Sequence, residues 1–399
     1  MQMNIEWKIL MNNFKIPKIR FNNFKAFWVE KRIADIVNIS AGGDVDKERL
    51  KESGKYPVIA NALTNKGIVG FYDDYKVKAP AVTVTGRGDV GYAVARHENF
   101  TPIVRLLTLQ SENIDVDYLE NQINSMRILN ESTGVPQLTA PQLGNYKVYH
   151  PEIDEQSAIG SLFRTLDDLL ASYKVNLANY QSLKATMLSK MFPKAGQTVP
   201  EIRLDGFDGE WKLYELKSRT ETITKGTTPK DKSWQGEVNY IKTESINRDS
   251  GSLVRTASTS LEEHLGYLKR SQLKEGDVLF SIVGTLGVVG LVDKKDLPAN
   301  TNQQIAIIRL NRDNAIFMLN FLKSPRIKSF IKSDSTIGAQ PSLSLWQIEK
   351  IKVSLPPSLE EQQSIGTYFS NLDNLIAAHQ EKISQLETLK KKLLQDMFI

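Results

Sequence analysis

Two long segments of this chain share one sequence pattern and align without a gap at an offset of 206 residues. The first, EQSAIGSLFRTLDDLLASYKVNLANYQSLKATMLSKMF, covers residues 155–192, and the second, EQQSIGTYFSNLDNLIAAHQEKISQLETLKKKLLQDMF, covers residues 361–398. Neither contains a proline, and each begins with acidic residues after a proline-containing turn, which is typical of a helix start. At about 1.5 Å per residue, each segment can form a helix of about 57 Å. Any fold of this chain must therefore accommodate two long, similar helices.

A shorter repeat precedes each long segment. The sequence PKIRFNNFKAFW at residues 17–28 matches PEIRLDGFDGEW at residues 200–211, at an offset of 183 residues. The second half is therefore longer by 206 − 183 = 23 residues, all between the matching ends, so that the ends repeat while the middles diverge. We expect two unlike modules, each followed by a long helix. The expected parts are a first module at 1–154, a central helix at 155–192, a linker at 193–199, a second module at 200–360 and a C-terminal helix at 361–399.

Apolar residues follow a seven-residue rhythm in both predicted helices, and polar residues interrupt it at the matching positions Asn176 and Lys382. Such a rhythm is typical of helices that pair with each other. Because a module separates the helices in sequence, the simplest pairing is an antiparallel coiled coil that gives the chain an internal pseudo-twofold repeat. The alternative is that each helix packs only on its own module. The residues expected between the helices are Ile159, Leu162, Leu166, Leu169, Tyr173, Tyr180, Leu183, Ile365, Tyr368, Leu372, Leu375, Leu386, Leu389 and Leu393.

The composition is that of an ordinary globular protein, and it excludes several classes of site. The chain has 399 residues, a net charge of +5 and no cysteine, so disulfides and thiolate metal sites are excluded. Its four histidines, which lie far apart in sequence, do not form a ligand pair, and we expect no metal site. No uncharged run exceeds 15 residues, and the more apolar of the two that reach this length, at residues 278–292, contains three glycines and is too short for a membrane helix. We expect a cytoplasmic protein with an α+β fold of two β-rich, mixed α/β modules.

A glycine motif in the first module has the spelling of a dinucleotide-binding fingerprint but not its context. The stretch AVTVTGRGDVG at residues 81–91 contains G-x-G-x-x-G, yet an alternating, strand-like segment follows where the fingerprint requires a helix. The second module offers a partial echo in GDVLFSIVGTLGVVGLV, where we align Gly287 and Gly290 with Gly88 and Gly91. Both stretches predict a strand, a glycine-rich turn and a second strand. Glycine there provides unusual φ angles or close backbone approach.

A tryptophan recurs at the end of the shorter repeat. Glu210-Trp211-Lys212 faintly resembles part of a nuclease metal site, but the matching Phe27-Trp28-Val29 carries no carboxylate. A repeated tryptophan anchor explains both stretches better. Spellings of other common catalytic motifs, such as G-x-x-x-x-G-K-[ST], H-E-x-x-H and G-x-S-x-G, do not occur in the sequence. We therefore expect no catalytic residues in this chain.

Two related runs carry a resemblance to a known family. They are STGVPQLTAPQLGNYKVYHPEIDEQSAIG in the first half and TIGAQPSLSLWQIEKIKVSLPPSLEEQQSIG in the second. With KGTTPKDKSWQGEVNYIKTESI at residues 225–246, TNQQIAII at residues 301–308 and the C-terminal LKKKLLQDMF, the chain resembles the DNA specificity subunit of type I restriction-modification systems. The first module lacks a G-T-T-P sequence and in this respect departs from the second.

The resemblance implies a non-catalytic protein that recognises double-stranded DNA. Each module would read one half of a split, asymmetric sequence, and the paired helices would set the distance between the halves. Two modification subunits would dock on the helices and transfer methyl groups from S-adenosylmethionine to adenine. Two restriction subunits could add ATP- and Mg-dependent translocation and cleavage. The cofactors would belong to these partners, with none on this chain and no membrane involved.

Candidate DNA contacts are side chains that can bond to phosphates or to base edges. Arg87 is the first choice, because the glycines on either side would bring the backbone close to a ligand. The full set is Lys66, Arg87, Arg96 and His97 in the first module, and Lys225, Thr227, Thr228, Lys230, Trp234, Lys242, Arg248 and Arg270 in the second. Two other functions remain open: a coiled-coil adaptor that never binds DNA, and a nucleotide-dependent enzyme that uses residues 86–91.

Overall fold

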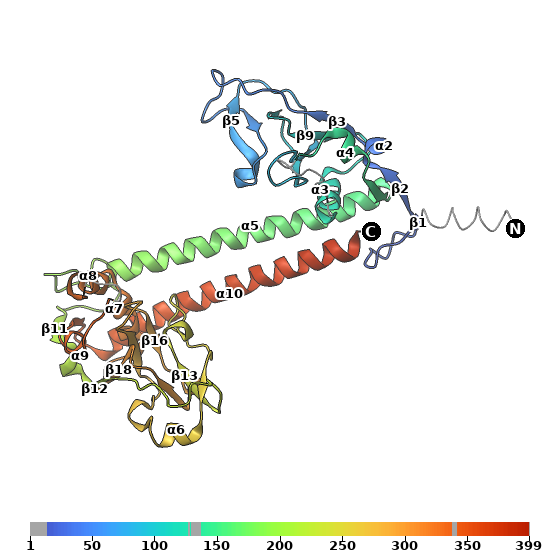
Figure 1. Ribbon diagram of the computed structural model, residues 1–399. Helices are drawn as coiled ribbons and strands as arrows, with labels where there is room; N and C mark the ends of the chain where they lie inside the picture. The colour runs from blue at the N-terminus through green and yellow to red at the C-terminus, as the bar shows by residue number, and fades with distance from the viewer. Residues whose placement is uncertain (1–13, 127, 129–136, 337–340, 399) are drawn as a thin grey trace. The chain divides into compact units, whose positions relative to one another are not determined.

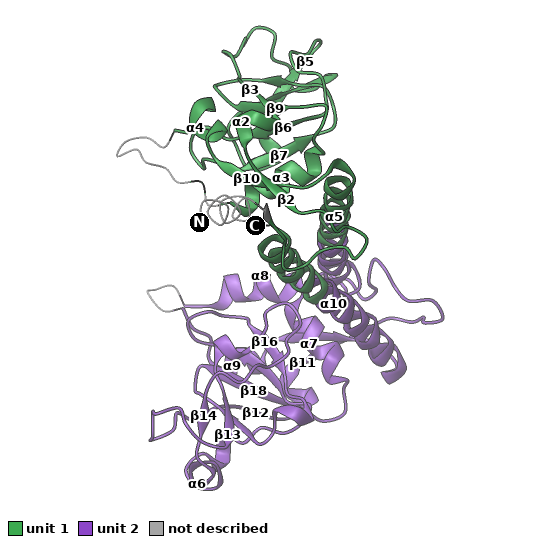
Figure 2. Ribbon diagram, turned by 90° about the vertical axis from the view of Figure 1, so that its right-hand side faces the viewer, with its two compact units in different colours: residues 1–174, 381–399 green, residues 175–380 purple. Residues whose placement is uncertain are grey.

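Two long helices, α5 (Ile153–Lys190) and α10 (Leu359–Met397), lie within two residues of the bounds that the sequence predicts (Figure 1). The computed structural model describes residues 14–126, 128, 137–336 and 341–398. The chain forms two units, of which unit 1 contains Met1–Lys174 with Glu381–Ile399 and unit 2 contains Val175–Gln380. Both long helices change colour part-way in Figure 2, because each is divided between the units. Each unit therefore holds one module together with a segment of each long helix.

Unit 1 is built from small sheets and short helices. Its strands form a sheet β1-β2-β10, a four-stranded sheet β3-β9-β6-β7 and a sheet β5-β4-β8. These strands are β1 (Phe14–Lys15), β2 (Trp28–Arg32), β3 (Asn38–Ala41), β4 (Tyr56–Ile59), β5 (Ile68–Tyr72), β6 (Ala81–Val84), β7 (Ala93–Arg96), β8 (Thr101–Pro102), β9 (Leu107–Gln110) and β10 (Lys147–His150). The helices are α2 (Ile33–Ile36), α3 (Val116–Ser125) and α4 (Ala140–Gly144), with a 3-10 turn η1 (Thr64–Gly67).

Unit 2 contains a sheet β11-β19, a four-stranded sheet β12-β18-β15-β16 and a sheet β14-β13-β17. Its strands are β11 (Lys212–Glu215), β12 (Thr220–Lys225), β13 (Val238–Ile241), β14 (Ser258–Thr259), β15 (Val278–Ser281), β16 (Val289–Leu291), β17 (Ala299–Thr301), β18 (Ile305–Leu310) and β19 (Lys352–Leu355). Its helices are α6 (Leu261–Leu265), α7 (Ala315–Lys323), α8 (Pro325–Asp334) and α9 (Leu345–Glu349). Short 3-10 turns are η2 (Leu216–Arg219), η3 (Thr243–Ser245), η4 (Lys269–Ser271) and η5 (Lys294–Asp296).

The two modules share one topology although their sequences diverge. In each four-stranded sheet, the strand that comes first in sequence (β3 or β12) lies beside the strand that comes last (β9 or β18). The two strands of the glycine hairpin, β6-β7 or β15-β16, follow on the other side of that last strand. In the sheets β5-β4-β8 and β14-β13-β17 the central strand pairs antiparallel with one neighbour and parallel with the other. Strands β6 and β15 are apolar or small throughout and buried at every position, as expected for central strands. The prediction of two β-rich, mixed α/β modules is confirmed.

In unit 1, the segments of α5 and α10 pack on each other and on the module. Their buried side chains, Ile159, Phe163, Leu166, Leu170, Leu386, Met397 and Phe398, form one core cluster with Trp28 and Tyr118. Ion pairs join Asp167 to Lys390, 2.5 Å apart, and Lys174 to Glu387, 2.7 Å apart. From the first ion pair to the second, the residue number rises on α5, from 167 to 174, and falls on α10, from 390 to 387. The two segments therefore run antiparallel.

Unit 2 contains the matching contacts from the other segments of the same helices. Lys184 forms a close ion pair with Asp373, and these positions are the repeat equivalents of Lys390 and Asp167. The Tyr180 ring lies 5.1 Å from the His379 ring, so these segments are antiparallel too. The sequence repeat therefore places an equivalent ion pair between the helices in each unit.

The buried face of the helices differs in part from the expected one. Four expected interface residues are exposed by 37–44%, namely Leu169, Leu183, Leu375 and Leu389, and for these the prediction of burial is wrong. Leu170 and Ile376, which are next in sequence to two of them, are buried instead. The seven-residue rhythm assumes that each helix packs only on its partner, whereas these helices also pack on a module, which moves the buried stripe around the helix. The other expected residues are buried or packed against the cores: Ile159, Leu162, Leu166, Tyr173, Tyr180, Ile365, Tyr368, Leu372, Leu386 and Leu393.

Candidate nucleic-acid interface

A buried ion pair attaches the first module to the start of α5. Arg20 donates from Nε and Nη2 to the two carboxylate oxygens of Glu155, with both distances 2.6 Å. The Trp28 indole Nε1 donates to the same carboxylate at 3.1 Å, and Trp28 is completely buried. The expected tryptophan anchor is confirmed, and its polar partner is a glutamate on the helix. This junction fixes where the module sits on its own helix segment.

The second module is attached to α10 in the same way. Arg203 donates to both carboxylate oxygens of Glu361 at 2.8 Å, and the Trp211 indole donates to Glu361 at 3.3 Å. The Glu361 side chain is only 1% exposed. The sequence pattern indicated only that these acidic residues mark a helix start, and it did not predict this role. The signal was available, because the arginine recurs at the 183-residue offset and the glutamate at the 206-residue offset.

The glycine motif of the first module forms the expected strand-turn-strand. Strands β6 and β7 pair antiparallel, and Gly88 and Gly91 adopt φ angles of 71° and 89°, which other residues rarely adopt. The Thr85 hydroxyl bonds to the Asp89 carbonyl and accepts from the Tyr92 N–H at 2.9 Å, which closes the turn. No helix follows the turn, so the geometry required for dinucleotide binding is absent from this described segment.

The equivalent turn joins β15 and β16 in the second module. Gly284 and Gly287 have φ angles of 77° and 73°, and the Ser281 hydroxyl donates to the Thr285 carbonyl at 2.6 Å, just as Thr85 does in the first module. Gly284 and Gly287 are therefore the structural equivalents of Gly88 and Gly91, and our alignment with Gly287 and Gly290 was wrong. Gly290 lies within β16, where a side chain would press on Ile246 and Leu253.

The first-module candidates have different environments. Arg87 is half-buried at the tip of the glycine turn, beside a backbone bridge to Gln137. Lys66 is exposed in η1 with a φ of 50°. Arg96 is only 8% exposed and donates to the Thr83 hydroxyl at 2.9 Å and to the Lys66 carbonyl at 2.7 Å. Burial lowers the pKa of Arg96 to about 10. Arg96 therefore supports the Lys66 turn from inside, and its candidacy as a direct DNA contact does not fit this position.

His97 is exposed on the edge of the first module, but its ring is already engaged. Its Nε2 lies 2.9 Å from an Asp117 carboxylate oxygen on α3. Arg164 of α5 lies 3.8 Å from the other oxygen of the same carboxylate. His97 thus belongs to a small cluster with a carboxylate, which weakens its suitability for contacting a phosphate.

Three second-module candidates line one hollow of about 300 Å³. Thr228 donates to Gln303 at 2.5 Å, and the Lys242 ammonium lies 3.6 Å from the centre of the Trp234 ring. Trp234 also packs against Tyr240, with ring centres 5.3 Å apart, so it forms a wall of the hollow. The sequence analysis did not single out the other lining residues, which are Lys232, Asn302, Gln303 and Gln304, although it quoted the TNQQ stretch that contains three of them.

The remaining candidates lie outside this hollow. Thr227 has a structural role, because its N–H donates to Thr301 and its carbonyl accepts from the Tyr240 hydroxyl. The Lys230 ammonium lies 4.9 Å from the centre of the Tyr267 ring. Lys225, Arg248 and Arg270 are exposed, in β12, in a loop and in η4 respectively.

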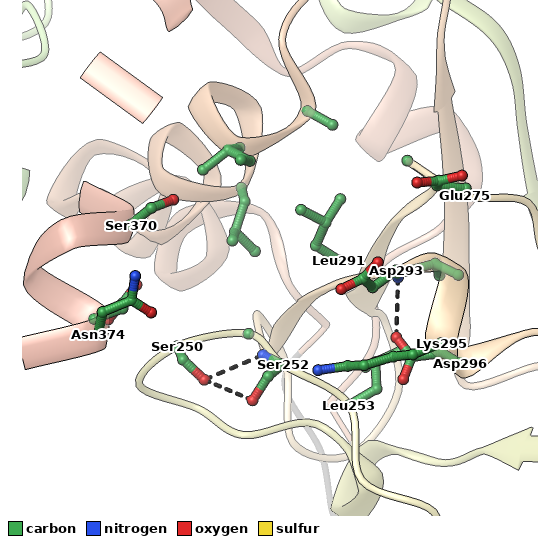
Figure 3. Close-up of a pocket in the computed structure, with 17 residues that line it drawn as sticks. Ser250, Ser252, Leu253, Glu275, Leu291, Asp293, Lys295, Asp296, Ser370 and Asn374 are labelled. Atoms are coloured by element: carbon green, nitrogen blue, oxygen red, sulfur yellow. Dashed lines mark hydrogen bonds between the residues drawn. The ribbon is translucent and has the colours of Figure 1, made fainter. Parts of the chain in front are cut away.

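A larger hollow of about 480 Å³ lies elsewhere in unit 2, beside α10 (Figure 3). Its lining includes Glu275, Asp293, Asp296 and Asp373, with Lys295 the only cationic side chain among its lining residues. None of the candidate DNA contacts lines it. Carboxylates repel phosphates, so this hollow does not fit nucleic acid. Across the described ranges, no group of three or more His, Cys, Asp or Glu side chains is placed to hold a metal ion.

Comparisons with known proteins agree with these features. The family model for the type I restriction modification DNA specificity domain matches residues 26–179 and 208–388. The chain belongs to this DNA specificity family. The two matched ranges coincide with the two modules and their helices. The two sequence runs that carried the family resemblance begin at residues 132 and 336. Parts of them, residues 132–136 and 337–340, lie outside the described residues.

Two curated relatives of this specificity-family chain match 91% and 66% of its length. It is 26% identical over 370 residues to the type I specificity subunit S.MpnORF507P of Mycoplasma pneumoniae, which covers 91% of this chain and 94% of that protein. It is 23% identical over 275 residues to the type I restriction enzyme MjaVIII specificity subunit of Methanocaldococcus jannaschii, covering 66% of this chain and 64% of that protein. These relatives are specificity subunits, which are non-catalytic.

The fold also matches a solved structure of this family. The crystal structure of a type I restriction-modification S subunit from M. genitalium has a TM-score of 0.66 and 18% sequence identity. The match covers 96% of this chain and 99% of that chain. The mixed α/β fold with two β-rich domains and long helices is therefore that of a specificity subunit. None of the helices in the described ranges combines the length and apolar character needed to cross a bilayer.

Proposed function

We propose that this chain recognises a bipartite, asymmetric site in double-stranded DNA, with one half-site read by each module. The observation that carries the proposal is that one topology occurs twice, attached to the long helices by the same Arg-Glu-Trp junction. The surfaces beyond the shared framework differ, since the G-T-T-P stretch beside the hollow of the second module has no counterpart in the sequence of the first. Two different surfaces on the same structural framework are suited to recognising two different half-sites. The chain itself performs no chemistry in this proposal.

The two long helices would act as the spacer between the half-sites. We infer that they form one antiparallel coiled coil with pseudo-twofold symmetry. The equivalent ion pairs Asp167–Lys390 and Lys184–Asp373 support this, as do the equivalent ring contacts Phe163–Phe398 and Phe192–Phe369. Successive base pairs of B-DNA are about 3.4 Å apart along the axis, so the length of the helices would select the number of base pairs between the half-sites.

The exposed leucines are candidate docking residues for partner subunits. Leu169 lies two residues from Asp167 and Leu389 two residues from Glu387, so helical geometry puts each leucine about 200° away from an ion-paired side chain. Apolar side chains left exposed along paired helices fit a partner helix. We propose two methyltransferase subunits as partners, with two restriction subunits as a further addition. S-adenosylmethionine, ATP and Mg would be bound by those partners, and the complex would act in the cytoplasm.

Methylome sequencing tests the proposal directly. DNA from cells that carry this chain with its methyltransferase partner should show adenine methylation at one split site with two different halves. Insertion of one heptad into each long helix, between residues 174 and 175 and between residues 380 and 381, adds about 10 Å. We expect a spacer longer by about three base pairs, with both half-sequences unchanged.

Two outcomes would contradict this function. A changed half-sequence at constant spacing would refute the spacer role of the helices. The competing adaptor function predicts no binding of the chain, with its partner, to random-sequence duplexes. A DNA reader instead loses affinity steeply between low and high salt, because its cationic side chains displace counterions.

A further inference from the structure

Two stretches that lie far apart in sequence meet at the 300 Å³ hollow of the second module. The Thr227 N–H donates to the Thr301 carbonyl at 2.9 Å, and the Gly226 N–H donates to the Ile305 carbonyl at 3.3 Å. Gly226 lies so close that any Cβ there would collide with the Thr301 carbonyl. The G-T-T-P stretch needs its glycine for this contact. The G-T-T-P stretch and the segment around Thr301 are therefore held together beside the hollow.

Within the hollow, a single hydrogen bond orients the amide of Gln303. The Thr228 hydroxyl donates to Gln303 Oε1 at 2.5 Å. This bond turns Gln303 Nε2 away from Thr228, and Nε2 has no hydrogen-bond partner among the described residues. The neighbouring amides are already paired, because Asn302 Nδ2 donates to Gln304 Oε1 at 3.3 Å. Gln303 is exposed and presents two N–H donors and one remaining oxygen lone pair to solvent.

The charge around Gln303 suits nucleic acid. Lys232 and Lys242 line the hollow, and its lining residues include no carboxylate. Lys242 lies on the Trp234 ring, which holds the ammonium at a defined place. Trp234 adopts a φ of 58°, a strained conformation for a bulky residue that is often found at functional sites. An oriented amide in the same hollow as two cations can thus meet a base edge while the lysines neutralise phosphates.

We propose that Gln303 reads an adenine in the major groove of the half-site bound by the second module, and that Thr228 is its positioning residue. Glutamine recognises adenine through two bonds, in which Nε2 donates to N7 and Oε1 accepts from the N6 amino group. The bond from Thr228 leaves both of these groups available, since the oxygen has two lone pairs. This inference rests on the proposed DNA-reading function and adds one contact to it.

Selection of bound sequences from a random duplex pool tests the contact. The protein is the full chain with its methyltransferase partner, as wild type, Gln303→Ala, Thr228→Val and Thr220→Val. Thr220 is the matched control, because its hydroxyl also bonds to a neighbour, the Lys217 carbonyl, but lies outside the hollow. We expect Gln303→Ala to relax one A·T position of one half-site by roughly 5- to 150-fold, the range for one bidentate contact. Thr228→Val should relax the base preference at the same position, and Thr220→Val should leave the base preference at every position unchanged.

A modified base provides the second readout. At the relaxed position, 7-deazaadenine removes the N7 acceptor and should weaken binding by wild type while leaving binding by Gln303→Ala unchanged. Relaxation of a G·C position, or an equal effect of 7-deazaadenine on both proteins, would overturn the adenine contact. Sharp preference at every position in Gln303→Ala would overturn it as well. Each of these results leaves the proposed function standing, whereas a wild-type protein that selects no sequence would refute the proposed function itself.

Discussion

The buried junction at the start of α10 gives a stability prediction with a defined magnitude. Glu361 accepts two hydrogen bonds from Arg203 at 2.8 Å and one from Trp211 at 3.3 Å, while the side chains of Glu361 and Arg203 are 1% and 14% exposed. Removing one partner of a buried pair costs about 3–5 kcal/mol, because the other charge stays buried without compensation. Glu361→Gln places an amide N–H₂ against the donors of Arg203. We expect the free energy of unfolding of unit 2 to fall by about 3–5 kcal/mol.

Removing both charges should largely restore stability. Replacement of a buried ion pair by apolar residues is often neutral or stabilising. In the double variant Arg203→Met/Glu361→Leu, the Trp211 N–H loses its acceptor, which costs about 1–3 kcal/mol. We therefore expect the double variant to be more stable than Glu361→Gln. This order distinguishes an uncompensated charge from a simple loss of contacts, which would make the double variant the less stable of the two.

Hydrogen-deuterium exchange resolved by peptide measures this effect in each unit separately. Since about 1.4 kcal/mol corresponds to a factor of ten in exchange rate, a loss of 3–5 kcal/mol accelerates exchange of unit 2 amides by roughly 10²- to 10³-fold or more. Peptides of unit 1 serve as the internal reference. Glu360→Gln is the matched control, because Glu360 is the exposed neighbour and should contribute less than about 1 kcal/mol through the helix dipole. Acceleration below tenfold in Glu361→Gln would refute the reasoning.

Four further predictions concern pH dependence, backbone packing and partner docking. Burial, with Asp167 nearby, raises the pKa of Glu120 from 4.5 to about 7. Between these pH values folded unit 1 binds a proton that the unfolded chain releases, so the free energy of unfolding of unit 1 should fall as the pH rises from 4.5 to 7. Urea titrations of Glu120→Gln should show no such fall. Burial, with Lys184 nearby, lowers the pKa of Lys323 from 10.5 to about 7. Since the unfolded chain binds more protons than the folded one between these values, the free energy of unfolding of unit 2 should rise from pH 7 to 10.5. The variant Lys323→Met should show no such rise. Gly226→Ala should cost about 1–3 kcal/mol or more in thermal unfolding, whereas Gly43→Ala, which meets only the Lys76 ammonium at 3.8 Å, should cost far less; equal losses would contradict the collision with Thr301. Leu169→Ser with Leu389→Ser should leave the chain's own stability within about 0.5 kcal/mol but weaken capture of the methyltransferase subunit in calorimetry, and unchanged affinity would exclude these leucines from docking.

The sequence by itself determined the repeat and the elements that follow from it. The bounds of α5 and α10 could be predicted because 38 residues without proline, with a sustained apolar rhythm, have few alternatives to a helix. The glycine hairpins were predictable for a similar local reason, since β6 and β15 consist of apolar or small residues and a glycine follows each within three residues. The tryptophan anchors followed from their recurrence in the shorter repeat.

Tertiary structure alone decided which side chains are buried and which are available to a ligand. Arg96 and His97 are adjacent in sequence, yet one is buried beneath the Lys66 turn and the other bonds to Asp117 on α3. Leu169 and Leu170 are equally apolar, yet only Leu170 is buried, in a cluster that joins α5, α10 and the first module. Gln303 becomes a candidate reader only because Thr228, 75 residues earlier, folds beside it. Local patterns record the preferences of neighbours along the chain, whereas burial and orientation depend on partners that only the folded chain brings together.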